Sequence, residues 1–269
     1  MPTYLDRILT VHRVAAAADL RPIERLVRQA EEAPADDRRG FRAAIEADRG
    51  ARGAVRAERV AVIAEIKRRS PSQGDLAPDL SPDVQAKAYQ QGGAACLSVL
   101  TDREFFGGSS KDLVAARAAT GLPALRKDFT VGPADVCDAR LMGADAVLLI
   151  VTALSLPSLR QLVDLASHLG LDALVEVHDE VEVEVALAAG ATLIGVNQRD
   201  LVTFEVDTGR AERLAARIPD GVIRVAESGI AGPDDARRLA GAGYHAVLVG
   251  EALVRSGDPA SAVAALRGV

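Results

Sequence analysis

Residues 143–180 run GADAVLLIVTALSLPSLRQLVDLASHLGLDALVEVHDE, and this stretch contains the unit from which the fold can be deduced. Two apolar runs, at 146–151 and 173–177, have the length and composition of buried strands. The segment between them, 157–169, has the spacing of an amphipathic helix. Parallel strands need such a crossover helix, so the stretch predicts a strand–helix–strand unit of an α/β protein.

The same unit recurs along the rest of the chain. Strands are predicted at 60–67, 95–101, 124–127, 146–151, 173–177, 193–197, 222–227 and 246–249, and helices at 82–91, 111–119, 134–142, 157–169, 179–189, 208–217, 233–242 and 259–266. Eight units with no strand left over favour a closed (β/α)8 TIM barrel over an open doubly wound sheet, whose G-x-G-x-x-G fingerprint is missing. The length of 269 residues suits one such barrel, which takes about 250.

The first 58 residues have helical periodicity and no strand pattern. We therefore expect an N-terminal helical extension over 1–58 and a barrel over 59–269, together forming one structural unit. Leu5, Ile8 and Leu9 form an apolar stripe that needs a surface to cover it. We expect the extension to pack over part of the barrel mouth.

Composition excludes several classes of protein. A net charge of −6 does not suit a nucleic-acid partner, and no apolar run approaches the roughly 20 residues of a membrane span. The N-terminus lacks the basic start, apolar run and cleavage site of a signal peptide, so we expect a cytoplasmic protein. Cys96 and Cys137 lie in apolar segments and are expected to be buried, with no disulfide and no metal site.

Lysine is rare in this chain. Of 32 basic residues only Lys67, Lys87, Lys111 and Lys127 are lysines. Lysine differs from arginine in that it can release a proton when its environment lowers its pKa, and in being a compact charge. Lys67 and Lys127 lie at the ends of predicted strands, where such chemistry would be used.

The active site of a TIM barrel lies at the carboxyl ends of its strands, and six of the eight predicted ends carry polar residues. These residues are Glu65 and Lys67, Arg126 to Asp128, Glu176, Asn197 with Arg199, Glu227 with Ser228, and Glu251. Glu65 and Lys67 are two positions apart in a strand, so both should face the barrel interior. One charged strand end is equally well explained by contact with solvent. Six charged or polar ends at one mouth are better explained by a site. Lysines and carboxylates brought together there should shift one another's pKa values, as acid–base catalysis requires.

Three further features of these strand ends have a functional and a structural interpretation. Gly229 and Gly250 follow the last two strands, where barrels bind phosphate through free backbone N–H groups; the alternative is two turn glycines. Ser70 lies near Lys67 in a Ser-Pro-Ser segment that is either a plain turn or a source of hydroxyl donors. His178 follows the fifth strand. A single histidine in a loop is more typical of a polar neighbour of a site than of a catalytic residue. The predicted ligand is a sugar phosphate.

Eight segments together resemble the indole-3-glycerol-phosphate synthase family. They are AEIKRRSPSQG (64–74), SVLTDREFFGGS (98–109), LRKDF (125–129), GADAVLLI (143–150), LVEVHDE (174–180), IGVNQRDL (194–201), AESGI (226–230) and LVGEALV (248–254). They occur in family order and span the barrel, and EIK-x-x-SPS, LRKDF and LVEVH are not general features of phosphate-binding barrels.

The resemblance implies a lyase of tryptophan biosynthesis. It implies that 1-(2-carboxyphenylamino)-1-deoxyribulose 5-phosphate is converted to indole-3-glycerol phosphate, carbon dioxide and water, with no cofactor and no metal. Lys127 is then the general acid that protonates the ribulose carbonyl oxygen during ring closure, which a guanidinium could not readily do. Glu176 and Glu65 are candidates for base or electrostatic partner, and the sequence leaves open which acts in which step.

The remaining site residues follow from the same resemblance. Lys67 binds an acidic group of the substrate and is a candidate second acid. Asn197, which is also counted as catalytic, and Arg199 bind hydroxyl or carboxylate oxygens of the substrate. Ser228, Gly229, Gly250 and the backbone of Glu251 bind its phosphate. Phe106, Phe129 and Leu148 contact its aromatic ring, and Ser70 and Glu227 are further substrate-binding residues. The family often has Tyr-Gln where this chain has Ala134-Asp135, and Asn where it has Gln198. These departures are expected to alter substrate affinity rather than abolish activity.

Two other functions fit the same barrel. In a Schiff-base aldolase, Lys127 would be a neutral amine that attacks a sugar-phosphate carbonyl, and borohydride would trap the adduct. A non-catalytic sugar-phosphate sensor would have lost a catalytic residue, and none is missing. For all of these a small molecule is the expected partner and a monomer the expected state, with an oligomer left open.

Overall fold

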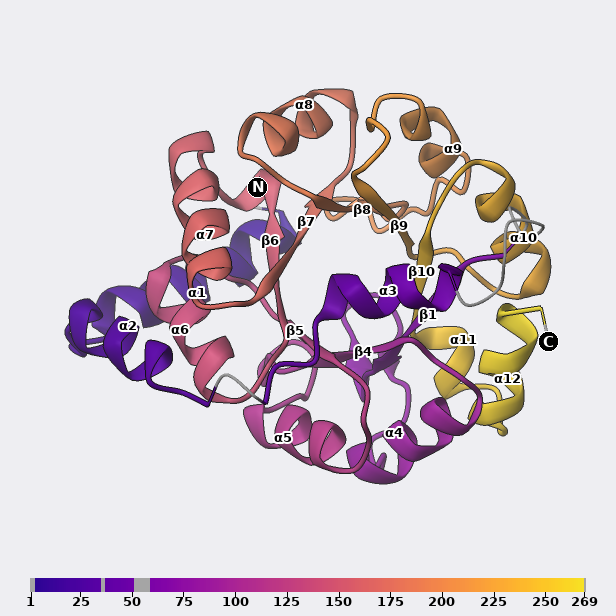
Figure 1. Cartoon of the computed structure of the whole chain (residues 1–269), viewed down its shortest axis with the longest axis horizontal. Coiled ribbons are helices and arrows are strands. Elements are labelled where there is room, and N and C mark those ends of the chain that lie inside the picture. Colours follow the sequence, from indigo (N-terminus) through magenta and orange to yellow (C-terminus); the bar gives the residue numbers. More distant parts are fainter. Residues whose placement is uncertain (1–2, 35–36, 51–58, 269) are drawn as a thin grey trace.

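The computed structural model describes residues 3–34, 37–50 and 59–268, and eight of its strands form a closed parallel barrel (Figure 1). Around the barrel they are β1 (Ala61–Ile66), β4 (Cys96–Leu100), β5 (Ala124–Lys127), β6 (Ala146–Ile150), β7 (Asp172–Val177), β8 (Leu193–Asn197), β9 (Ile223–Glu227) and β10 (Ala246–Val249), which pairs with β1. The predicted TIM barrel is confirmed, and each strand boundary lies within one residue of its predicted position.

Helices follow the strands and cover the outside of the barrel (Figure 1). They are α4 (Pro82–Gln91), α5 (Ser110–Ala118), α6 (Pro133–Leu141), α7 (Leu156–His168), α8 (Glu180–Ala188), α9 (Arg210–Ala215), α10 (Pro233–Gly241) and α12 (Pro259–Leu266). Helix α9 is shorter than the predicted 208–217, because the chain before it is held in a turn by Asp207, which accepts a hydrogen bond from the Gly209 N–H at 3.1 Å.

Four short elements are not predicted by the sequence pattern. They are the antiparallel pair β2 (Arg69–Ser70) and β3 (Gly74–Asp75), the 3-10 turn η1 (Val151–Ala153), and α11 (Glu251–Val254). The β2–β3 pair follows β1 and α11 follows β10, so both lie in loops at the carboxyl end of the barrel.

The barrel strands are buried on both faces, and the alternation of their side chains divides the core in two. In β1, Ala61 and Ile63 belong to the cluster inside the barrel, whereas Val62 and Ala64 belong to the cluster shared with the outer helices. Glu65 has the same parity as Ile63. Its carboxylate therefore continues the inward row at the carboxyl end of the strand.

Three helices precede β1: α1 (Tyr4–Ala18), α2 (Ile23–Glu31) and α3 (Phe41–Gly50). Helix α3 crosses the amino-terminal end of the barrel, where the fully buried Phe41 and Ile45 join the interior cluster (Figure 1). Helix α2 packs on α6. Helices thus occupy the described part of the predicted extension, whereas residues 51–58, with the predicted boundary after residue 58, lie outside the described residues.

Helix α1 lies at the opposite, carboxyl end of the barrel. Its His12 contacts Asp102 in the loop after β4, with 3.0 Å between Nε2 and Oδ2. Its Arg13 donates a hydrogen bond of 2.9 Å to the carbonyl oxygen of Ala153 in η1. The extension therefore contacts the barrel at both of its ends.

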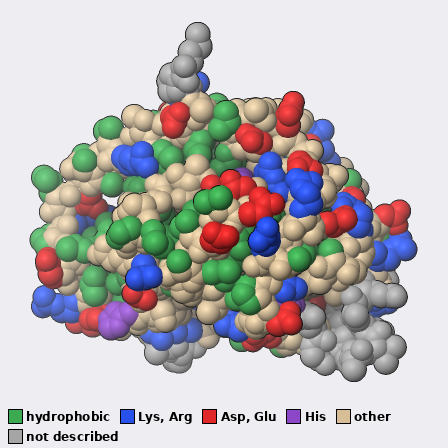
Figure 2. Space-filling view, turned by 90° about the horizontal axis from the view of Figure 1, so that it is seen from above, with side chains coloured by type: hydrophobic (Ala, Val, Ile, Leu, Met, Phe, Trp, Pro, Cys, Tyr) green, Lys and Arg blue, Asp and Glu red, His purple; other side chains and the backbone are tan. Residues whose placement is uncertain are grey.

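The surface carries both signs of charge. On the face shown in Figure 2, acidic and basic side chains lie close to one another among apolar ones. In the part of the chain that the structure describes, no helix combines the length and the hydropathy needed to span a bilayer.

Candidate active site

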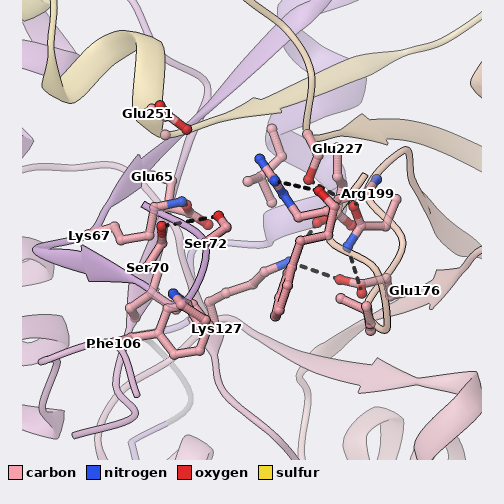
Figure 3. Close-up of a pocket in the computed structure, with 18 of the residues that line it drawn as sticks. Glu65, Lys67, Ser70, Ser72, Phe106, Lys127, Glu176, Arg199, Glu227 and Glu251 are labelled. Carbon is pink, nitrogen blue, oxygen red and sulfur yellow. Dashed lines mark hydrogen bonds and ion pairs between the residues drawn. The ribbon is translucent and has the colours of Figure 1, made fainter. Parts of the chain in front are cut away.

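The polar strand ends meet in one pocket of about 440 Å³ at the carboxyl end of the barrel (Figure 3). The fifteen residues to which the sequence assigns a catalytic or binding role all line it: Glu65, Lys67, Ser70, Phe106, Lys127, Phe129, Leu148, Glu176, Asn197, Arg199, Glu227, Ser228, Gly229, Gly250 and Glu251. They come from every barrel strand or from the loop that follows it. Parallel strands closed into a barrel bring all of these ends to one mouth.

Lys127, the last residue of β5, lies between two buried carboxylates. Its Nζ donates to Glu176 Oε2 at 3.0 Å and to Glu227 Oε2 at 2.6 Å. Burial alone would lower the pKa of this ammonium, but the charges of Glu176 and Glu227 outweigh burial and raise it. The expectation that the environment of Lys127 lowers its pKa is therefore wrong: the two carboxylates raise it, and Lys127 is positively charged at neutral pH.

The two carboxylates differ in their pKa. Burial and the nearby charge of Glu176 raise the pKa of Glu227 to about 7, although Lys127 opposes the shift. Oε1 of Glu227 is buried without a hydrogen-bond partner, and Gly195 of β8 leaves room for it, because a Cβ there would lie 2.1 Å from that oxygen. Glu227 thus changes its charge near neutral pH.

Glu176 is held in its charged form. Burial would raise its pKa, but the charge of Lys127, together with the nearby His178 and a hydrogen bond from Asn197, outweighs burial and lowers it. Asn197 Nδ2 donates to Glu176 Oε1 at 3.0 Å. The Oδ1 atom of Asn197 accepts from Ser228 Oγ at 2.8 Å and from the Arg199 N–H at 3.0 Å, which fixes the orientation of the amide.

A second lysine–carboxylate pair lies on the β1 side of the pocket. Lys67 Nζ is 2.6 Å from Glu65 Oε1, as the inward parity of the two residues predicts (Figure 3). Ser70 and Ser72 of the following loop face this pair, with 3.5 Å between their hydroxyl oxygens. Ser70 also accepts a hydrogen bond of 3.2 Å from the Gln73 N–H, so the segment is a turn that presents hydroxyl groups to the pocket.

Backbone groups shape the end of the pocket near β9 and β10. Ser228 and Gly229 both have positive φ, 65° and 67°, a conformation that is costly for serine and recurs at functional sites. A Cβ on Gly229 would lie 2.5 Å from Val206 Cγ1, and a Cβ on Gly250 would lie 2.4 Å from Glu65 Oε1. A larger residue at either position would therefore clash with its neighbours. Gly250 lies directly before the first turn of α11.

Apolar side chains line the remaining wall. The rings of Phe106 and Phe129 lie 6.2 Å apart between centroids, next to Leu148. Tyr4 and Phe204 also line the pocket, and their rings meet edge to face at 5.2 Å, but neither lies at a predicted strand end or in a matched segment. Leu5 and Ile8 of the apolar stripe of α1 are also pocket residues, so this helix of the extension covers part of the mouth.

The departures from the family pattern lie beside the pocket. Asp135 accepts hydrogen bonds from the N–H groups of Val131 and Gly132 at 2.9 and 3.1 Å, so it stabilises the start of α6. Gln198 is fully buried, and its Nε2 donates to the carbonyl oxygen of Ser228 at 2.8 Å. Gln198 therefore supports the strained turn without lining the pocket itself.

Comparison with known proteins finds relatives over most of the chain. The family model described as indole-3-glycerol phosphate synthase matches residues 5–266. A curated indole-3-glycerol phosphate synthase from Parafrankia sp. (strain EAN1pec) is 56% identical over 81% of this chain and 81% of its own length. One from Nocardioides sp. (strain ATCC BAA-499 / JS614) is 56% identical over 80% of this chain and 82% of its own.

Two solved structures are similar in fold. Thiamine phosphate pyrophosphorylase from Pyrococcus furiosus has a TM-score of 0.58 at 17% identity, covering 80% of this chain and 96% of that one. N-acetylmannosamine-6-phosphate 2-epimerase from Clostridium perfringens has a TM-score of 0.59 at 17% identity, covering 76% and 92%. Identities this low establish a shared fold and nothing about the reaction.

Proposed function

Since this chain belongs to the indole-3-glycerol phosphate synthase family, we propose that the pocket at its barrel mouth performs the family's ring closure with Lys127 as general acid. Family membership makes the chain a decarboxylating lyase of tryptophan biosynthesis. The observation that carries the assignment is the Lys127 ammonium, held at 3.0 and 2.6 Å by two buried carboxylates.

Ring closure creates charge that this cluster can meet. When an aromatic carbon of the substrate attacks the ribulose carbonyl, the carbonyl oxygen becomes an alkoxide, which is a far stronger base than an amine. A protonated Lys127 donates its proton to that oxygen. Glu227, whose pKa is about 7 and whose Oε2 is 2.6 Å from Nζ, is placed to return a proton to the lysine.

The remaining steps release carbon dioxide and water. Loss of the carboxylate as carbon dioxide restores the aromatic six-membered ring. The new hydroxyl then takes a proton and leaves as water, and loss of a proton from the adjacent carbon of the five-membered ring completes the indole. We assign Glu176, fixed in its charged form, as the electrostatic partner of Lys127. We assign Glu65 as the base and Lys67 as the acid of dehydration, because they form the second close pair of the pocket.

Binding is assigned to the rest of the pocket. Gly229, Gly250 and the backbone of Glu251, with Ser228, are proposed to hold the phosphate, where glycine lets an anion approach backbone N–H groups. Asn197, Arg199, Ser70 and Glu227 are proposed to bind the substrate's other polar groups. Phe106, Phe129 and Leu148 are proposed to contact its aromatic ring. No step requires a cofactor or metal.

One assay tests the function and one alternative. The purified chain is incubated with 1-(2-carboxyphenylamino)-1-deoxyribulose 5-phosphate, and formation of the indole ring of indole-3-glycerol phosphate is followed by fluorescence. Turnover is expected, with no protein adduct after borohydride treatment, since a charged Lys127 is a poor nucleophile. Absence of turnover, or a trapped adduct at Lys127, would contradict the proposal.

We also propose a cytoplasmic monomer that binds small molecules and no nucleic acid. The net charge of −6 and the mixture of charges in Figure 2 support the last point, since nucleic-acid binding depends on a basic surface. Fractionation of cells and light scattering of the purified chain test location and oligomeric state. A dimer mass or recovery in another fraction would overturn these two assignments.

A further inference from the structure

His178 lies behind the acid–base cluster and has no part in the steps proposed above. It follows β7, two residues after Glu176, and its side chain is largely buried, 13% exposed. Its Nε2 is 3.5 Å from Glu176 Oε1, the oxygen that also accepts from Asn197. His178 does not line the pocket, so it can act on the reaction only through Glu176.

The other side of the imidazole is anchored to α8. His178 Nδ1 is 3.0 Å from Glu182 Oε2, and the same oxygen accepts from the His178 N–H at 2.7 Å. Glu182 is itself fixed, because its Oε1 accepts from the hydroxyl of Thr152 in η1, and its N–H donates to Asp179 at 2.8 Å. A continuous set of contacts therefore runs from η1 and α8 to Glu176.

We infer that His178 is a positioning residue: its imidazolium bridges Glu182 and Glu176, holding Glu176 so that Oε1 faces the protein and Oε2 faces Lys127. This inference rests on the roles proposed for Lys127 and Glu176. The two oxygens of Glu176 support it, since Asn197 and His178 lie on one and Lys127 on the other.

The charge of His178 agrees with this geometry. Burial would lower its pKa, but Glu176 and Glu182 outweigh burial and raise the pKa of His178 to about 10. The charged groups that contact His178 are Glu176 of β7 and Glu182 of α8. Glu176 in turn faces Lys127 of β5 and Asn197 of β8. At neutral pH the bridge is a cation between two anions, and it helps to keep Glu176 ionised.

Two substitutions separate the two ends of the bridge. In His178→Asn, the amide nitrogen takes the place of Nδ1 and keeps the Glu182 contact, but nothing reaches Glu176. In His178→Gln, the longer side chain places an amide nitrogen near the Nε2 position, toward Glu176. We expect His178→Asn to lower kcat about 10- to 100-fold with KM within about twofold, and His178→Gln to recover part of the loss.

The pH profile supplies a readout that a purely structural role would not move. Without the imidazolium, the pKa of Glu176 should rise, so the acid limb of kcat should shift to higher pH in both neutral variants. His168→Asn is the matched control, because His168 is an exposed histidine that contacts Glu31 on the surface. It should leave kcat, KM and the pH profile unchanged.

These experiments distinguish a wrong role for His178 from a wrong function for the pocket. If the wild type is active, Lys127→Arg is impaired, and His178→Asn has normal kcat and an unshifted acid limb, the inference is wrong and the function stands. If His178→Asn does not fold, Glu182→Gln serves instead, since it removes the charge that anchors His178. A smaller kcat loss with the same acid-limb shift supports the bridge, and unchanged kinetics overturn it.

Discussion

Lys127 is the residue on which the reaction rate should depend most. In Lys127→Arg the positive charge and much of the length remain, so an electrostatic anchor would be partly preserved. A guanidinium is delocalised and keeps its proton in proteins, whereas an ammonium can give one up to a base as strong as an alkoxide. We expect a kcat loss of roughly 10²- to 10⁴-fold, the usual contribution of a general acid, with a modest change in substrate affinity. Steady-state kinetics measure both.

Two lysines serve as comparisons for this substitution. Lys67→Arg should damage affinity about as much as rate, because Lys67 is assigned to binding as well as to dehydration. Lys111→Arg is the control, since Lys111 is exposed in α5 and should behave as wild type. Near-normal kcat in Lys127→Arg would remove proton donation from the proposal.

Gly250 shows how a phosphate-loop residue can also affect catalysis. From the sequence alone, a substitution there should act mainly on KM. In the structure a Cβ at this position would lie 2.4 Å from Glu65 Oε1, so Gly250→Ala must displace the carboxylate that pairs with Lys67. We expect KM to rise and kcat to fall together, each by about tenfold. An effect on KM alone would show that Glu65 can move without cost to the reaction.

At the scale of elements, the strands can be predicted from the sequence and the loops cannot. Buried parallel strands are short apolar runs separated by helices, so the local pattern contains their boundaries. The direction of Glu65 and Lys67 follows from the same alternation. The contact of His12 with Asp102 joins residues 90 positions apart. Phe204, which has a positive φ, packs edge to face on Tyr4 at the start of the chain. Neither has a local signal.

Helix α1 is held at the mouth by a contact that should depend on pH. Burial would lower the pKa of His12, but Asp102 and Asp128, with Asp135 farther away, outweigh burial and raise it. Below the ordinary value of 6.5, His12 is charged in both the folded and unfolded states, so its contribution is fully present. As pH rises through the raised pKa, the charge and its stabilisation of α1 are lost.

Limited trypsin cleavage after Arg13 measures how often α1 detaches. We expect cleavage of the wild type to increase from pH 6 to pH 9 relative to His12→Asn, which has no titrating group at this position. The ratio of the two cleavage rates removes the pH dependence of trypsin itself. A ratio that stays constant over this range would show that the charge of His12 does not hold the helix.

At the scale of the whole molecule, the sequence predicts a helical extension and a barrel but not how the extension is divided. Its three helices all have apolar stripes, and periodicity alone assigns none of them to an end of the barrel. In the structure, α3 closes the amino-terminal end through Phe41 and Ile45, whereas α1 covers the pocket with Leu5 and Ile8. We propose that residues 1–58 and 59–269 form one unit for this reason: the two ends of the barrel need different parts of the extension.

Two truncations should therefore have different effects. Removing residues 1–20 deletes α1 and exposes the apolar side of the pocket to water. Each of Leu5 and Ile8 contributes about 1.5–3 kcal/mol if its burial against substrate is lost, so kcat/KM should fall at least about tenfold while circular dichroism of the barrel is retained.

Removing residues 1–50 also deletes Phe41 and Ile45 from the interior, at about 2–5 kcal/mol each against a total stability of about 5–15 kcal/mol. This longer truncation should lose its cooperative thermal transition or have a much lower Tm. Full turnover without α1, or an unchanged Tm without α3, would contradict the division of roles between the two helices.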